Sequence, residues 1–465
     1  MNAPNSGQPP AVGPPAAEPG EFGEPDEPDL RRRFYLTVAT KFLVSTVFAA
    51  GWTGLAVWLS QPWIADLSLV VGPVLAWVMV ALTAYLPGLV VALLAMSLLL
   101  DRQPRLRVLD PDSPVTVIIA ALNEERGIAA TIRGVARSEY AGPISIILAD
   151  NGSTDATVAV ALDAAAELDI DLTVIREQRP GKSHALNRAL VEVTTACVIT
   201  VDADTILHRE ALRRLMSRFE SSAEDTVAIA GSVLVRNSRI NLLTKMQEWD
   251  YYLGIAGVKR MQGLYQSILV AQGAFSVYLT DAVREVGGWP DAIGEDIVVT
   301  WRLMQSGRRV VFEPTAVAFT NTPTTTVQFF RQRARWARGM FEGIRAVPPW
   351  RQKRVLTRFV AGIDLLIPLL DVGYALVWLP GLVLAILGYP IIVSVWTLAV
   401  LPITLLVYGL LRHYQSNKVF GPLGLTVRRN RLGYIAFLLV YQVICSVAAL
   451  TGYAQFISGT TRRWK

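Results

Sequence analysis

Long apolar runs lie toward the two ends of the chain, and only short ones lie between them. A run over 34–59 is interrupted by a single charge, Lys41, and a run over 69–100 carries none. A helix of about 20 residues rises 1.5 Å per residue and crosses a hydrocarbon layer roughly 30 Å thick. The pattern therefore predicts two transmembrane helices, over 34–59 and about 76–100.

The apolar pattern returns after residue 350. Runs over 360–389, 391–411 and 433–457 predict about three more transmembrane helices. The first of these runs contains Asp364 and Asp371, and ionisable residues inside a span usually face a cavity or the membrane interface. We therefore expect an interfacial or cavity-lining portion in this segment.

Between these blocks, short apolar runs alternate with amphipathic stretches. Runs rich in β-branched residues predict buried strands over 115–120, 144–149, 172–175, 197–201 and 227–235. Amphipathic stretches predict helices over 126–138, 155–168, 183–193 and 209–219. Alternation of this kind is typical of an α/β domain with a mostly parallel sheet, in which ligands bind at the carboxyl ends of the strands.

Composition strengthens the membrane interpretation. Hydrophobic residues make up 52% of the 465 residues and charged residues only 18%, whereas a soluble domain carries about a quarter charged residues. Residues 1–30 are rich in Pro, Gly and Ala and contain six acidic and no basic residues, which predicts a disordered tail. The rest of the chain has a net charge of +12, which suits membrane lipid and anionic substrates. No basic run interleaved with aromatics indicates nucleic acid.

Basic residues flank the first two predicted spans on one side, with Arg31–Arg33 before them and Arg102 after them. The positive-inside rule then places the following segment, and the basic loop 412–431, in the cytoplasm. Three C-terminal spans would put the basic end, 462–465, outside, so its side stays open.

The predicted organisation has four parts. They are a tail over 1–30, two spans over 31–107, a cytoplasmic domain over 108–350, and about three spans with interfacial segments over 351–465.

Polar side chains follow three of the predicted strands. Asn123 and Glu124 follow the first, and Asp150 follows the second in a Gly-Ser turn that could simply be a capped helix start. Asp202 and Asp204 follow the fourth, and their i, i+2 spacing on an extended segment points both carboxylates to one side. There they could share one hard cation with diphosphate oxygens. The alternative is a solvated loop.

A lysine stands at a predicted helix start, in Pro180-Gly181-Lys182-Ser183. The segment resembles the end of a phosphate-binding loop, but Arg176 occupies the position of the earlier glycine, which disfavours triphosphate hydrolysis. Lys182 is still well placed to meet an anion at the helix N-terminus.

Two later motifs have plain interpretations when each is taken alone. Glu295-Asp296 could be an acid pair at a helix start, and Gln332, Arg335 and Trp336 could form the membrane-surface face of an amphipathic helix. Their joint occurrence with the earlier carboxylates, in this order and between two sets of spans, indicates a catalytic site.

Over about residues 112–345 the sequence resembles the membrane-embedded family-2 glycosyltransferases, which include the cellulose, hyaluronan and poly-N-acetylglucosamine synthases. The poly-β-1,6-N-acetylglucosamine synthase group is the most similar, through these residues: Glu295-Asp296-Ile297 with Trp301 and Leu303, Glu313-Pro314, Pro323, and Gln332-Arg333-x-Arg335-Trp336-Ala337 with Gly339 and Glu342. The sequence departs from the pattern at Asn151, where many relatives have aspartate, and at Gly294, where threonine is common. The resemblance implies an inverting enzyme with a GT-A-type nucleotide-sugar-binding domain and a mostly parallel, mixed sheet.

The resemblance also implies roles for the residues singled out above. Donor-binding residues are expected at Asn123, Glu124, Asp150, Lys182, Asp202 and Asp204. Of these, Asp202 and Asp204 would hold Mg²⁺ or Mn²⁺. Asp296 would be the catalytic base, and the acceptor and diphosphate would meet Glu295, Gln332, Arg335 and Trp336.

Three functions remain open at this level. The leading hypothesis is a processive synthase of the cell membrane that polymerises sugar from UDP-N-acetylglucosamine or UDP-glucose, with an accessory membrane subunit as a possible partner. The alternative enzyme is a nonprocessive transferase whose acceptor is a lipid, such as diacylglycerol or polyprenyl phosphate, rather than a growing glycan. A sugar-nucleotide sensor without turnover is a third class, which retention of the base Asp296 disfavours.

Overall fold

The chain divides into residues 1–36 and residues 37–465, and a computed structural model describes residues 36–459 apart from 103 and 394–400. The predicted tail over 1–30, the basic flank Arg31–Arg33 and the basic end over 462–465 lie outside the described residues. All elements below belong to the second unit.

An eight-stranded mixed sheet forms the centre of the domain, in the order β3-β2-β1-β4-β7-β6-β8-β5. The strands are β1 (Val115–Ala121), β2 (Ile144–Asp150), β3 (Leu172–Arg176), β4 (Cys197–Asp202), β5 (Ile206–Leu207), β6 (Thr226–Val235), β7 (Phe275–Leu279) and β8 (Arg309–Thr320). The first four strands are parallel, β7 runs antiparallel to β4 and β6, and β8 runs parallel to β6. The mostly parallel, mixed sheet is therefore confirmed, and the five predicted strands are correct to within one residue at each end.

Strands β5, β7 and β8 were not predicted. The sequence pattern does not indicate β8, because Glu313-Pro314 interrupts its apolar run. The pairing with β6 shifts register there, since Ala230 pairs with Phe312 but Ser232 pairs with Val317. A proline lacks the N–H that a regular ladder needs, so the irregularity accommodates it.

Alternate side chains of the central strands enter two apolar cores on opposite faces of the sheet. Ile118 packs in one core with Leu186, and Ile119 packs in the other with Leu215. The covering helices are α5 (Ile128–Ala136), α6 (Thr157–Glu167), α7 (Lys182–Leu190), α8 (Ala211–Glu220), α11 (Thr280–Glu285) and α12 (Glu295–Gln305). Burial on both faces explains why the central strands read as continuous apolar runs.

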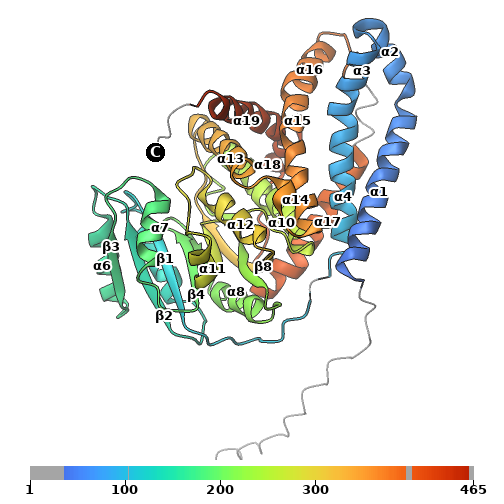
Figure 1. The fold of residues 1–465 in the computed structure, drawn as a ribbon. Helices are drawn as coiled ribbons and strands as arrows, with labels where there is room; N and C mark the ends of the chain where they lie inside the picture. Colours follow the sequence, from blue (N-terminus) through green and yellow to red (C-terminus); the bar gives the residue numbers. More distant parts are fainter. Residues whose placement is uncertain (1–35, 103, 394–400, 460–465) are drawn as a thin grey trace, which may run out of the picture. The chain divides into compact units, whose positions relative to one another are not determined.

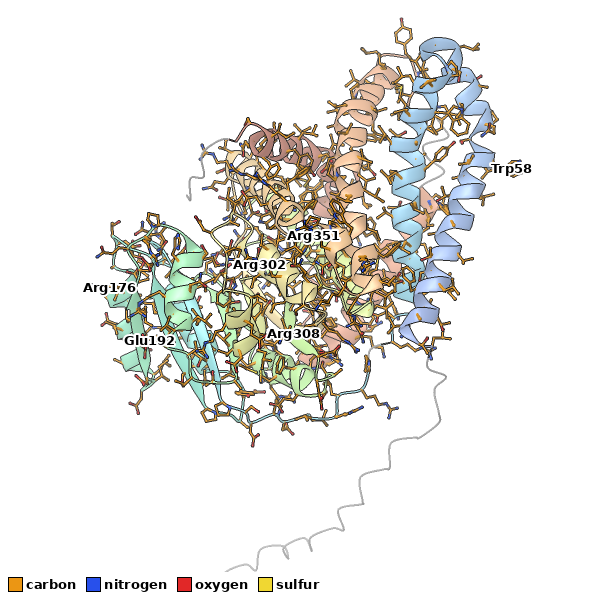
Figure 2. The ribbon with its side chains drawn as sticks, in the orientation of Figure 1. Trp58, Arg176, Glu192, Arg302, Arg308 and Arg351 are labelled. Atoms are coloured by element: carbon orange, nitrogen blue, oxygen red, sulfur yellow. The ribbon has the colours of Figure 1, made fainter. Side chains whose placement is uncertain are left out.

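Within the described residues, four helical segments are long and apolar enough to cross a membrane: Val38–Leu59, Pro73–Leu99, Val355–Ile386 and Arg431–Ile457. They comprise α1 (Val38–Leu59), α3 (Pro73–Val80) with α4 (Leu86–Leu99), α14 (Val355–Ile363) with α15 (Ile367–Val372) and α16 (Leu379–Ile386), and α18 (Arg431–Ala436) with α19 (Gln442–Ile457). Figure 1 shows α1, α3, α4, α15 and α16 side by side. Near the end of α1, Trp58 projects outward with 71% of its surface exposed (Figure 2). The chain is a membrane protein.

The predicted span over 391–411 falls partly on 394–400, outside the described residues. The part after this gap belongs to α17 (Leu401–Tyr414), so a third C-terminal span stays a prediction. The structure also has a helix between the first two spans, α2 (Gln61–Val71), which the sequence did not predict.

Three helices connect the sheet to the spans: α9 (Leu242–Trp249), α10 (Ala256–Leu264) and α13 (Thr326–Ala346). α13 lies along α19 (Figure 1). The two helices approach closely because Gly452 has no side chain, and a Cβ there would lie 2.2 Å from the carbonyl oxygen of Ala334. Small residues allow such contacts between apolar helices.

Candidate active site

A cavity of about 620 Å³ lies at the carboxyl ends of β1 and β4, bounded by α10, α12 and α13. Nine of the eleven predicted site residues line it: Glu124, Lys182, Asp202, Asp204, Glu295, Asp296, Gln332, Arg335 and Trp336. The two exceptions, Asn123 and Asp150, lie beside it at the ends of β1 and β2. Topology thus brings together residues that are more than 200 positions apart.

Lys182 links two carboxylate groups across the cavity. Its ammonium contacts the carboxylate of Asp202, the last residue of β4, and lies 3.9 Å from that of Glu295, the first residue of α12. Burial alone would lower the pKa of Lys182, but the two carboxylates outweigh burial and raise it. Lys182 is therefore a fixed cation at the place where an anionic substrate group would lie.

Three carboxylates gather near the end of β4. Burial, followed by repulsion from Asp204 and Asp202, raises the pKa of Glu124 to about 7. Burial and Asp202 also raise the pKa of Asp204, although the Thr320 hydroxyl donates a 3.1 Å hydrogen bond to it. Carboxylates that repel one another in this way fit a bound divalent cation, which would relieve the repulsion.

The donor set suits Mg²⁺ or Mn²⁺, which prefer oxygen ligands. In the part of the chain that the structure describes, no three His, Cys, Asp or Glu side chains are placed to hold a metal by themselves. A cation held by Asp202 and Asp204 would complete its coordination with other oxygen atoms, such as those of water or of a diphosphate.

The acid pair is held against α13 by two glycines. A Cβ added at Gly294 would lie 2.9 Å from the Cα of Gly339, so the backbones touch and threonine has no room. The close approach leaves no space for a side chain at Gly294 unless α13 shifts. It also fixes the start of α12, where Glu295 and Asp296 lie, against the helix that carries Trp336.

The two acids of the pair have different surroundings. Asp296 Oδ1 accepts a 2.9 Å hydrogen bond from the Ile297 N–H, and Oδ2 accepts a 3.4 Å one from the Gly273 N–H. Burial and repulsion from Asp296 raise the pKa of Glu295 to about 7, against the opposing effect of Lys182. Of the two, Asp296 is the one not bridged to Lys182 by a salt bridge.

Asn123 and Asp150 organise the loops beside the cavity. Asn123 adopts a left-handed conformation (φ 56°), and its Oδ1 accepts a 2.8 Å hydrogen bond from the Thr154 N–H. Asp150 is buried and accepts a 3.1 Å hydrogen bond from the Ser153 N–H. Both side chains accept hydrogen bonds from backbone N–H groups of the protein. A nucleotide would therefore contact the surface of the loops that Asn123 and Asp150 hold together.

The hydrogen bonds of Asn151 explain why an amide can stand where many relatives have aspartate. Its Oδ1 accepts from the Gly181 N–H at 2.8 Å, and its Nδ2 donates to the carbonyls of Glu177 and Arg179 at 3.1 and 2.8 Å. A carboxylate could not make the two donor bonds. Asn151 therefore fixes the loop that presents Lys182.

Further polar residues line the cavity, among them Tyr251, Lys259, Gln272 and Asp364. Lys259 donates a 3.1 Å hydrogen bond to the Val270 carbonyl, and burial lowers its pKa to about 7 despite the attraction of Asp296. Nothing in the local sequence marks Lys259, whereas Asp364 is one of the two acids singled out above inside the apolar run 360–389.

The mixed sheet with its flanking helices has a GT-A-type fold, and the cavity lies at the carboxyl ends of its strands. In agreement, the structure resembles a mannosyltransferase from Pyrobaculum calidifontis, PcManGT, solved with GDP-Man and Mn²⁺. The TM-score is 0.56 at 20% identity, over 83% of this chain and 99% of that one.

Residues 111–339 match the family described as glycosyltransferase like family 2, so this part of the chain is a glycosyltransferase family 2 domain. Similar curated proteins include poly-β-1,6-N-acetyl-D-glucosamine synthases of Staphylococcus aureus (strain COL) and Staphylococcus epidermidis (strain RP62A). The first is 31% identical over 52% of this chain and 58% of its own length, and the second is 30% identical over 49% and 55%. The chain thus spans somewhat more than half the length of these relatives.

Proposed function

We propose that the protein is an inverting, processive β-glycosyltransferase that extends a poly-N-acetylglucosamine-like polysaccharide from a UDP-sugar. One observation carries the proposal: Lys182, Asp202 and Asp204 share a single cavity with Asp296 and Trp336. Donor-binding and acceptor-binding chemistry would thus meet at one place. Similarity to poly-β-1,6-N-acetyl-D-glucosamine synthases supports the polymer product.

The proposed chemistry is a direct displacement at the anomeric carbon of the donor sugar. Asp296 would take the proton from the attacking hydroxyl of the acceptor, a step for which a carboxylate general base contributes roughly 10²- to 10⁴-fold. The bond to the diphosphate breaks as the new glycosidic bond forms, so negative charge builds up on the leaving diphosphate.

Charge on the leaving group would be met from two sides. Lys182 and Arg335 line the cavity and supply fixed cations. A divalent cation held by Asp202 and Asp204 would neutralise further charge. Trp336 offers an apolar face for a sugar ring, and its indole N–H offers a donor for a hydroxyl.

The cavity reaches a membrane span, because its lining includes Asp364, which lies within Val355–Ile386. A growing glycan would leave the site through this region. We further propose that the protein crosses the cell membrane several times with residues 108–350 in the cytoplasm, where UDP-N-acetylglucosamine or UDP-glucose is available. A growing glycan, membrane lipid and an accessory membrane subunit are the proposed partners.

Product analysis tests the proposal. Purified protein in lipid nanodiscs with Mn²⁺ is given each radiolabelled UDP-sugar in turn, and label is counted in high-molecular-mass polymer and in the lipid extract. We expect label in polymer with wild type and with Asp163→Asn, an exposed control outside the cavity lining, and none with Asp296→Asn. Label in lipid alone would instead identify the nonprocessive enzyme, and UDP binding without any transfer would identify a sensor.

A further inference from the structure

Arg333 lies on α13 between Gln332 and Arg335 but does not line the cavity. Its Nη2 donates hydrogen bonds to Asp250 Oδ2 at 2.7 Å and to the Tyr441 hydroxyl at 2.6 Å. The Tyr441 hydroxyl in turn donates to Asp250 Oδ2 at 3.0 Å. Arg333, Asp250 and Tyr441, here called the Arg333 cluster, join three distant elements.

Each member of the cluster comes from a different part of the molecule. Asp250 begins the π-helical segment Asp250–Ile255 between α9 and α10, and Tyr441 ends the π-helical segment Phe437–Tyr441 of the last membrane span. The side chains of Arg333 and Asp250 are only 11% and 14% exposed. A buried ion pair persists only with good hydrogen-bond geometry, so the hydroxyl of Tyr441 is well placed to sustain it.

The cluster also touches a residue that faces the cavity. The Arg333 guanidinium lies 4.5 Å from the centroid of the Trp336 ring. Tyr251, which follows Asp250 in the chain, has its ring 6.3 Å from the same indole. Arg333 and Tyr251 are thus both attached to Asp250, Arg333 by an ion pair and Tyr251 by the peptide backbone.

We propose that the Arg333 cluster positions Trp336, so that the last membrane span sets the geometry with which the enzyme engages its acceptor. Arg333, Asp250 and Tyr441 are positioning residues, since none of them reaches the cavity. The part concerning the acceptor rests on the proposed function, whereas the ordering of α13 by Tyr441 does not.

Tyr441→Phe removes one hydroxyl and keeps the ring. The matched control is Tyr434→Phe in the same span, because Tyr434 packs its ring on Trp249 and takes no part in the cluster. Hydrogen exchange of peptides from 326–346 is measured on the full-length protein in nanodiscs, without substrate. We expect Tyr441→Phe to speed exchange around Trp336 by roughly 10- to 100-fold, because its hydroxyl makes hydrogen bonds to two charged groups, Arg333 and Asp250. Tyr434→Phe should match wild type.

The second measurement compares binding with turnover. Tyr441→Phe should keep UDP affinity within about twofold of wild type, shorten the polymer and raise the acceptor KM by about tenfold. Arg333→Lys retains a charge for Asp250 but loses the planar stacking surface, so it should show the same pattern. If Tyr441→Phe proves too unstable to purify, Arg333→Lys carries the test.

Two results would overturn the inference. One is equal exchange in Tyr441→Phe and Tyr434→Phe, and the other is a loss of UDP affinity in proportion to turnover, which indicates general misfolding. Faster exchange in Tyr441→Phe alone supports positioning even if the wild-type protein makes no polymer. Failure of the proposed function is therefore recognised separately.

Discussion

Replacing Asp296 by asparagine removes basicity while changing the structure very little. The amide oxygen that Asp296→Asn introduces can still accept the 2.9 Å hydrogen bond from the Ile297 N–H. The amide nitrogen would then face the Gly273 N–H and lose the long 3.4 Å contact. A hydrogen bond contributes about 1 kcal/mol to stability, so the folded protein should persist.

The expected loss of turnover is much larger than this structural cost. A general base contributes roughly 10²- to 10⁴-fold, which equals about 2.7 to 5.4 kcal/mol of transition-state stabilisation. Donor affinity should stay near wild type, because Lys182 bridges Asp202 and Glu295 and forms no salt bridge with Asp296. The variant should therefore bind UDP and transfer almost no sugar.

The assay pairs calorimetric UDP binding with sugar incorporation on the same preparation. Glu295→Gln is the matched comparison, since it neutralises the neighbouring acid, which lies 3.9 Å from Lys182; it should weaken UDP binding as well as turnover. Substantial activity in Asp296→Asn, or a drop in UDP affinity that parallels the drop in turnover, would refute the reasoning. Glu295 would then become the candidate base.

Three further perturbations follow from the site. Chelation with EDTA, or Asp204→Asn, should abolish incorporation without lowering the melting temperature, and full activity in EDTA would exclude a metal. Gly294→Ala should lower the free energy of unfolding by about 1 to 3 kcal/mol, because its Cβ would lie 2.9 Å from Gly339. The control is Gly362→Ala, where nothing lies within 4 Å of the added Cβ, so thermal unfolding should show no such loss. Lys259 has a pKa of about 7 in the folded protein, against a value near 10.4 in the unfolded chain. Between these pH values the unfolded chain binds more protons than the folded protein. The contribution of Lys259 to stability therefore rises with pH over this range. Lys259→Met should therefore stabilise the protein most below pH 7, and a melting-temperature difference that does not change from pH 6 to pH 10 would contradict this.

The sequence by itself determined the local elements and the chemical character of the site. Strands β1, β2, β4 and β6 could be located because most of their residues are buried, which leaves continuous β-branched runs with polar residues at their ends. The edge strand β3 is largely exposed or half-buried and was located by its short β-branched run between polar residues. Asp202 and Asp204 were recognisable for the same reason, since two carboxylates directly after a buried strand stand out. The apolar length that membrane thickness demands likewise located the spans that the structure describes.

Only the tertiary structure decided which of these residues meet. Strand β8 depends on a register shift at Pro314, and the acid pair depends on contact between Gly294 and Gly339. The Arg333 cluster acquires its surroundings from segments far away in the sequence. Such contacts leave no periodic trace along the chain, because their energies depend on packing and burial between distant segments and not on local propensity.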